Sequence, residues 1–270
     1  MRILAASEPS KSDKLNEDWF SVSPNLVVVL DGATARTDTG CIHGVSWYAA
    51  QLGAAVSTQA SDSAISLQAA LANAIEAVAS KHPECDLSSP GTPSAAVAIL
   101  RRTQDALEYL VLGDVGIVLA SDSRLSVVLD DRVDKTAQAE RREADNHLIG
   151  SAQKAAALIR MKHAELAARN AEGGFWVSAA DPSVVKYAIV DAVPLAVVNR
   201  SVVLTDGAAR FVRMFSEGNW KELLDLLEHK GPSEVLRRVR ECEESDPVGV
   251  RWPRNKKSDD ATLVYVANCR

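Results

Sequence analysis

Residues 26–32 read LVVVLDG, a valine-rich apolar run that ends in Asp31-Gly32. Such a run, bounded upstream by Pro24, predicts a buried strand with a turn at its end. Similar apolar runs follow along the chain, separated by segments rich in Gly, Asp and Ser. These runs predict strands over residues 94–101, 107–112, 116–120, 125–129, 201–204 and 261–266. Because only short turn segments separate the four runs between 94 and 129, we expect them to form an antiparallel meander.

Helical periodicity occupies much of the intervening sequence. It predicts helices over residues 44–58, 62–80, 207–215, 219–229 and 233–244, with Asp62 as the N-cap of the second. Residues 136–170 are also helical in composition, with Gly150 as a candidate break. Since strands and helices come in clusters rather than in alternation, the pattern predicts an α+β fold with a two-sheet core and helices outside.

The composition is that of a globular protein. The chain has 270 residues, of which 47% are hydrophobic and 24% charged, so extended disorder is excluded. Its formal net charge of −6 argues against a nucleic-acid binder and against a polybasic membrane anchor. Apolar runs are too short for a membrane-spanning helix, and the N-terminal one is too short for a signal peptide. We therefore expect a cytoplasmic, monomeric chain without nucleic-acid or membrane partners.

The cysteine pattern indicates no metal or redox motif. Cys41, Cys85, Cys242 and Cys269 share no Cys-x-x-Cys spacing, which favours neither a zinc knuckle nor a redox pair. We expect four unpaired, partly buried thiols in a reducing cytoplasm.

Acidic residues stand at the ends of the predicted strands and beside apolar segments. They are Asp31, Asp114, Asp206, Asp259 and the pair Glu17-Asp18. An Asp-Gly pair alone is a turn signal. Taken together, these carboxylates predict a cluster, because strand ends are rigid and loops at one sheet edge converge. Clustered carboxylates cannot all stay ionised without a cation, and Mg²⁺ and Mn²⁺ are hard cations that accept oxygen ligands. The lack of Cys/His ligand spacing argues against zinc.

Six segments occur in the order, and at roughly the intervals, of a known enzyme family: NEDWF, VVVLDG, GTPSAAVAIL, VLGDVGIVL, VVLTDGAARF and SDDATLVYV. In these segments the chain resembles the PP2C-type (PPM) metal-dependent protein serine/threonine phosphatases, as a divergent, compact bacterial-type member. The resemblance runs from about residue 13 to 266 and is weakest between 131 and 200. It implies an α-β-β-α sandwich and one phosphatase domain over residues 1–270, in which 131–200 form a variable, flap-like helical insertion.

The resemblance also implies an activity. Members of the family hydrolyse phosphoserine and phosphothreonine in proteins with two Mg or Mn ions. Asp31 would bridge the two metals, and Asp206 and Asp259 would hold the first. These three residues would act in catalysis through metal-bound water that attacks phosphorus.

Four further residues take roles from the same resemblance. Glu17 and the carbonyl of Gly32 would bind the second metal, with Asp18 behind them. Asp114 stands where the family places a ligand for a weaker third metal.

Two features of the sequence bear on phosphate binding. Asp13 stands where the family usually has an arginine that binds the substrate phosphate. Lys14 and Arg36 are the candidate replacements, although a lysine provides only a point charge. The basic segment 251–257 (RWPRNKK) runs directly into Asp259 and is either a solvated loop or a guide for an anionic substrate.

Other departures from the family pattern leave the function open. Ala33 follows the first Asp-Gly pair where the family often has a histidine, and His43 is a candidate substitute, although a lone histidine is more often structural. The segment GDVG at 113–116 lacks the serine and arginine of the related family motif. The retained carboxylates favour an active phosphatase. The departures favour a catalytically impaired relative that binds phosphoproteins. A phosphohydrolase acting on a small molecule is a third possibility.

Overall fold

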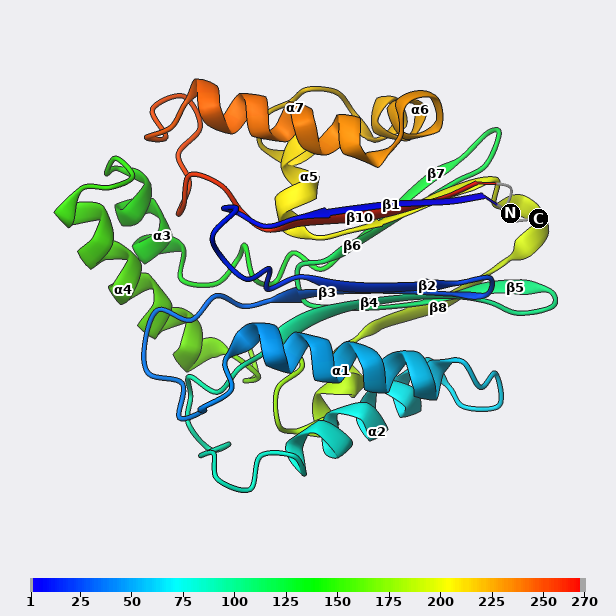
Figure 1. Cartoon of the computed structure of the whole chain (residues 1–270), viewed down its shortest axis with the longest axis horizontal. Helices are drawn as coiled ribbons and strands as arrows, with labels where there is room; N and C mark the ends of the chain where they lie inside the picture. Colours follow the sequence, from blue (N-terminus) through cyan, green and yellow to red (C-terminus); the bar gives the residue numbers. More distant parts are fainter. Residues whose placement is uncertain (1, 268–270) are drawn as a thin grey trace.

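The computed structural model describes residues 2–267. Two five-stranded sheets pack face to face, and helices cover both outer faces (Figure 1). This arrangement confirms the α+β sandwich predicted from the sequence. In the described part of the chain no helix is both long enough and apolar enough to cross a bilayer.

The strands of each sheet pair in an antiparallel manner. The first sheet has the order β1-β10-β9-β6-β7, and the second has the order β2-β3-β4-β5-β8. The first consists of β1 (Arg2–Glu8), β6 (Gly116–Ala120), β7 (Leu125–Leu129), β9 (Arg200–Leu204) and β10 (Ala261–Ala267). The second consists of β2 (Trp19–Ser23), β3 (Leu26–Gly32), β4 (Ala95–Arg102), β5 (Ala106–Leu112) and β8 (Ile189–Pro194).

The helices divide into three groups. Those against the second sheet are α1 (Val45–Ala60) and α2 (Leu67–Ala79). Those against the first are α5 (Asp206–Arg213), α6 (Trp220–Lys230) and α7 (Pro232–Ser245). The remaining pair, α3 (Gln138–Asp145) and α4 (Ala152–Ala168), projects from one end of the sandwich (Figure 1). Two short 3₁₀ helices, η1 (Pro182–Tyr187) and η2 (Leu195–Val197), flank β8.

Strand β3 shows why its sequence is apolar without interruption. Val28 and Leu30 belong to the hydrophobic cluster that contains Leu52 of α1. Val27 and Val29 point the other way, into the cluster between the two sheets. Because successive side chains of a strand face opposite sides, a strand covered on both sides is apolar at every position.

The meander predicted over 94–129 was wrong in one respect. β4 pairs with β5 and β6 pairs with β7, but the two pairs lie in different sheets. The chain crosses over at Gly113, whose φ of 85° is a conformation that glycine adopts readily. A Cβ at this position would lie 2.6 Å from that of Ala96. The GDVG segment is therefore a crossover between sheets.

Other local predictions also need correction. The strands β1, β2 and β8 were not predicted. The helix α2 begins at Leu67 rather than at residue 62. Its N-cap is Ser66 and not Asp62, because the Ser66 hydroxyl accepts a hydrogen bond from Ala69 N over 3.2 Å.

The cysteines are not four isolated thiols. The Sγ atoms of Cys41 and Cys85 lie 3.6 Å apart. Cys242 is a buried residue of α7, and Cys269 lies outside the described residues.

Candidate metal centre

Strand ends bring the predicted carboxylates together at one end of the sandwich. Asp31 lies in β3, Asp206 begins α5 directly after β9, and Asp259 precedes β10. Antiparallel pairing of β9 with β10 sets the end of one strand beside the start of the other. Asp31, Asp206, Asp259 and Asp114 line one cavity of ≈ 440 Å³. The segments that meet here are far apart in sequence, as the cluster predicted from the strand ends requires.

Glycines allow the loops of this site to approach closely. The backbone N–H of Asp206 lies 3.4 Å from Asp31 Oδ2. A Cβ on Gly207 would lie 2.0 Å from the carbonyl oxygen of Asp260, and a Cβ on Gly32 would lie 2.5 Å from that of Glu17. Glycine is therefore needed in both Asp-Gly pairs, because any side chain there would clash with a neighbouring backbone oxygen.

Glu17 is held at the edge of the cluster by three hydrogen bonds. Its N–H donates to Asp260 Oδ2 over 2.7 Å, and its carbonyl accepts from Gly32 N over 3.2 Å. Its side chain accepts from the Thr34 hydroxyl over 2.6 Å. Asp260 also accepts a hydrogen bond from Ser10 N. Asp259 and Asp260 therefore have different roles. Asp259 lines the cavity, whereas Asp260 anchors the segment that carries Glu17.

Asp18 lies behind this cluster. Its Oδ2 accepts a hydrogen bond from the Thr205 hydroxyl over 3.0 Å, whereas its buried Oδ1 has no hydrogen-bond partner. Burial raises the pKa of Asp18 well above its usual range, and the charges of Asp259 and Asp260 raise it further. An orphaned buried oxygen of this kind fits a site that is completed by an ordered water or ion.

The remaining carboxylates repel one another. Burial raises the pKa of Asp31 well above its usual range, and the charges of Asp18 and Asp206 add to the effect. Burial and the charge of Asp259 raise the pKa of Asp206, and burial with the charge of Asp206 raises that of Asp114 to about 7. A divalent cation would restore the ionised forms, so this set of oxygen donors fits Mg²⁺ or Mn²⁺.

Asp259 differs because two cations of the chain already bind it. Its Oδ2 accepts a hydrogen bond from the Arg210 guanidinium over 2.7 Å, and Arg210 also pairs with the buried Glu243. Its Oδ1 forms an ion pair with Lys256, which also donates to the Thr34 hydroxyl over 3.1 Å. Burial opposes the charged form of Lys256, but the Asp259 charge outweighs it and raises the lysine's pKa. The sequence analysis missed both cations, although the basic segment that precedes Asp259 was a signal for Lys256.

The candidate phosphate contacts separate in space. Arg36 lines the cavity, whereas Lys14 is exposed and does not. Lys162 of α4 also lines it, and within residues 2–267 it makes no hydrogen bond or ion pair. Burial lowers the pKa of Lys162. His43, the candidate substitute for the missing histidine, does not line this cavity and stacks instead on Trp47.

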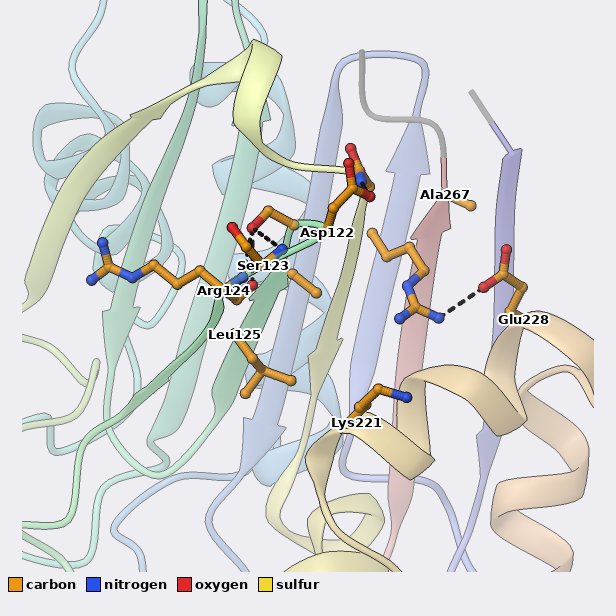
Figure 2. A pocket seen from close by; sticks show the side chains of 11 residues that line it. Asp122, Ser123, Arg124, Leu125, Lys221, Glu228 and Ala267 are labelled. Atoms are coloured by element: carbon orange, nitrogen blue, oxygen red, sulfur yellow. Dashed lines mark hydrogen bonds and ion pairs between the residues drawn. The ribbon is translucent and has the colours of Figure 1, made fainter.

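A larger cavity of ≈ 850 Å³ lies at the opposite end of the first sheet (Figure 2). It is formed by the turn at 121–124, the start of β9 and α6. Two of its basic side chains form ion pairs over 2.8 Å: Arg200 with Glu228 and Asp225, and Lys221 with Asp225. Because the lining carries more basic than acidic side chains, this cavity has less to offer a cation than the smaller one.

A family model described as protein phosphatase 2C matches residues 9–239. The chain belongs to the protein phosphatase 2C family. This finding confirms the resemblance read from the six segments. No curated protein sequence matches the chain.

Solved structures show the same protein phosphatase 2C fold. The Mycobacterium tuberculosis serine/threonine phosphatase PstP/Ppp is 17% identical, with a TM-score of 0.59 over 98% of this chain and 97% of that chain. The Staphylococcus aureus serine/threonine phosphatase Stp1 is 12% identical, with a TM-score of 0.59 over 98% and 94%. The PstP catalytic domain in complex with 2 manganese ions is 17% identical, with a TM-score of 0.57 over 98% and 96%. At these identities the likeness concerns the fold.

Proposed function

We propose that this protein phosphatase 2C member hydrolyses phosphoserine and phosphothreonine in proteins, and that it requires Mg²⁺ or Mn²⁺. The observation that carries the proposal is the convergence of Asp31, Asp114 and Asp206 on one cavity, where burial and mutual repulsion raise their pKa values. A cluster with this much uncompensated negative charge costs stability unless it binds a cation. The manganese in the PstP structure supports the choice of metal.

The proposed ligands follow the sequence analysis. Asp31 would bridge two ions, and Asp206 and Asp259 would hold the first. Divalent ions of this kind acidify water and stabilise charge that develops on a phosphoryl group. We also propose that residues 1–270 act as one domain. Within the 131–200 region, only α3 and α4 form the proposed flap beside the cavity, because β8 belongs to the second sheet.

The remaining proposed ligands also follow the sequence analysis. Glu17 and the Gly32 carbonyl would take the second ion, with Asp18 behind them. Asp114 is the proposed ligand of a third.

The chain's own cations complete the site. Arg36 and Lys162 line the cavity and are available to hold the oxygens of a phosphomonoester, and Lys256, which pairs with Asp259, lines it as well. Together they take over from the family arginine whose place Asp13 occupies. A lysine contacts phosphate as a point charge, so we expect weaker orientation of the substrate than an arginine fork provides.

Hydrolysis of a phosphothreonine peptide with and without added Mn²⁺ tests the proposal. Wild type should show metal-dependent hydrolysis, and Asp206→Asn should reduce it by on the order of 10²-fold. The matched control is Asp105→Asn, because Asp105 is exposed in the turn between β4 and β5. Absence of hydrolysis in wild type, or unchanged hydrolysis in Asp206→Asn, would refute the proposal.

One observation favours a second candidate, a catalytically impaired relative that binds phosphoproteins. Arg210 and Lys256 together occupy both carboxylate oxygens of Asp259. If this pairing persists when Mn²⁺ is present, the first metal loses a ligand. Titration calorimetry separates the two candidates: binding of a phosphopeptide without binding of millimolar Mn²⁺ would favour the impaired relative.

A further inference from the structure

Four metal-binding side chains gather at the start of α1 and the end of α2, outside the carboxylate cavity. They are Cys41, His43, His82 and Cys85, and their ligand atoms all lie within 4.8 Å of one another. Cys41 Sγ lies 3.6 Å from Cys85 Sγ and 3.7 Å from His43 Nδ1. Cys85 Sγ lies 3.5 Å from the same nitrogen.

These separations match the edges of a zinc tetrahedron. With Zn–S bonds of about 2.3 Å and Zn–N bonds of about 2.0–2.1 Å, tetrahedral geometry places two sulfurs about 3.8 Å apart and a sulfur and a nitrogen about 3.5 Å apart. The three separations among Cys41, Cys85 and His43 agree with these values to within a few tenths of an ångström. One ion can therefore reach all three atoms at normal bond lengths.

His82 has a nitrogen free to bind a metal. Its Nδ1 lies 2.9 Å from the carbonyl oxygen of Val78. Because a carbonyl only accepts, Nδ1 carries the proton and Nε2 carries the lone pair. This Nε2 is buried and has no hydrogen-bond partner. A backbone carbonyl that fixes the tautomer in this way is the usual support of a zinc-binding histidine.

Neighbouring groups hold the two ligand pairs in place. The N–H of His43 lies 3.4 Å from Cys41 Sγ, as a donor to a thiolate would. The His43 ring stacks on Trp47 with centroids 4.1 Å apart, and His82 packs edge-on against the same indole at 4.7 Å. Asp86 N donates to the carbonyl of Gly40 over 2.9 Å, which joins the two segments directly.

We propose that Cys41, His43, His82 and Cys85 form a structural zinc site, distinct from the carboxylate centre. Two thiolates and two imidazoles select zinc over Mg²⁺ or Mn²⁺. Four protein ligands close the coordination sphere, which assigns the ion a structural role. The inference does not depend on the proposed phosphatase activity.

The site clamps the loop at 33–44 to the end of α2. This loop begins directly after Gly32 of the carboxylate centre and carries Thr34 and Arg36, both of which line the cavity. Zinc would thereby fix the far end of a loop whose near end belongs to the candidate active site.

Cysteine spacing alone did not indicate this cluster. Each local pair mixes the two residue types, as Cys41-x-His43 and His82-x₂-Cys85, so a search for Cys-x-x-Cys finds neither. The pairs meet only when α1 and α2 pack side by side.

Metal analysis of the purified full-length protein tests the proposal. Protein prepared without chelators should contain about one zinc per chain. Cys41→Ser and His82→Gln should lose it. Cys242→Ala and Asp31→Asn should keep it, because Cys242 belongs to α7 and Asp31 to the other centre. Wild type without zinc would overturn the proposal, and so would zinc that persists in Cys41→Ser.

Cobalt substitution keeps the test independent of how the variants fold. Co²⁺ added to metal-depleted wild type should give the intense visible bands of a tetrahedral ion and a thiolate-to-cobalt charge-transfer band. Weak bands without charge transfer would overturn the proposal. A disulfide between Cys41 and Cys85, found by mass spectrometry of the native protein, would overturn it as well.

Discussion

The ammonium of Lys256 forms an ion pair with the carboxylate of Asp259, three residues further along the chain and inside the carboxylate cavity. The same carboxylate binds Arg210 on its other oxygen. A cation of the chain therefore occupies the place that a metal ion would take at Asp259. This competition has a measurable consequence.

Lys256→Met should bind Mn²⁺ about tenfold more tightly than wild type, a change of about 1.4 kcal/mol, because the ion no longer displaces an ammonium from Asp259. The same variant should bind inorganic phosphate more weakly. Titration calorimetry measures both. Lys257→Met is the control, since Lys257 pairs with Glu244 outside the cavity. An unchanged Mn²⁺ affinity in Lys256→Met would show that the ion pair does not compete with the metal.

Asp31→Asn should be at least as stable as wild type when metal is absent. Burial and the charges of Asp18 and Asp206 raise the pKa of Asp31, so a neutral side chain removes a repulsion. Thermal unfolding in EDTA measures this. Mn²⁺ at about 100 times its Kd should then add about 2.7 kcal/mol to wild-type stability and far less to the variant. A thermal shift by Mn²⁺ that survives in Asp31→Asn would contradict the bridging role.

The raised pKa of Asp114, about 7 against an ordinary value near 3.8, gives a pH dependence with a defined sign. A carboxyl whose folded pKa is raised binds more protons in the folded state than in the unfolded state. Metal-free wild type therefore loses stability as the pH rises from about 4 to about 7, and that loss persists above 7.

Asp114→Asn should remove this contribution. The difference in unfolding free energy between variant and wild type should shift in favour of the variant over the same pH range. Urea unfolding in EDTA at several pH values measures it, with Asp105→Asn as the control. A difference that stays constant with pH would show that Asp114 titrates normally.

Buried strands were predictable because burial on both faces requires an apolar residue at nearly every position. β3, β6 and β9 are covered on both faces, so an uninterrupted apolar run revealed each within two residues of its observed bounds. The missed strands β1, β2 and β8 lie at sheet edges and are partly exposed, so none of them is apolar along its whole length.

The site residues likewise divide into those that the sequence could predict and those that it could not. Carboxylates at strand ends could be predicted to converge, because strand direction fixes where Asp31, Asp206 and Asp259 lie. Arg210 lies on a helix and Lys256 in an irregular loop. The spacing of apolar residues in the sequence does not show where either side chain points. The cysteine and histidine pairs, 41–43 and 82–85, required the packing of two helices before they became neighbours.

Gly207 offers a test of whether close backbone approach shapes the centre. A Cβ at this position would lie 2.0 Å from the Asp260 carbonyl oxygen, and backbone at that distance cannot yield as a side chain can. Gly207→Ala should therefore displace α5 from β10, lower stability by about 2 kcal/mol and weaken Mn²⁺ binding.

Gly218→Ala is the matched control for this substitution. Its nearest neighbours are side-chain atoms of Glu222 and Phe211 at 3.1–3.2 Å, and no backbone atom is among them. This variant should therefore lose less stability than Gly207→Ala and keep its Mn²⁺ affinity. Urea unfolding and titration calorimetry on both variants measure the difference. If Gly207→Ala binds Mn²⁺ as tightly as Gly218→Ala, the contact between the Asp206 and Asp260 loops does not position the metal ligands.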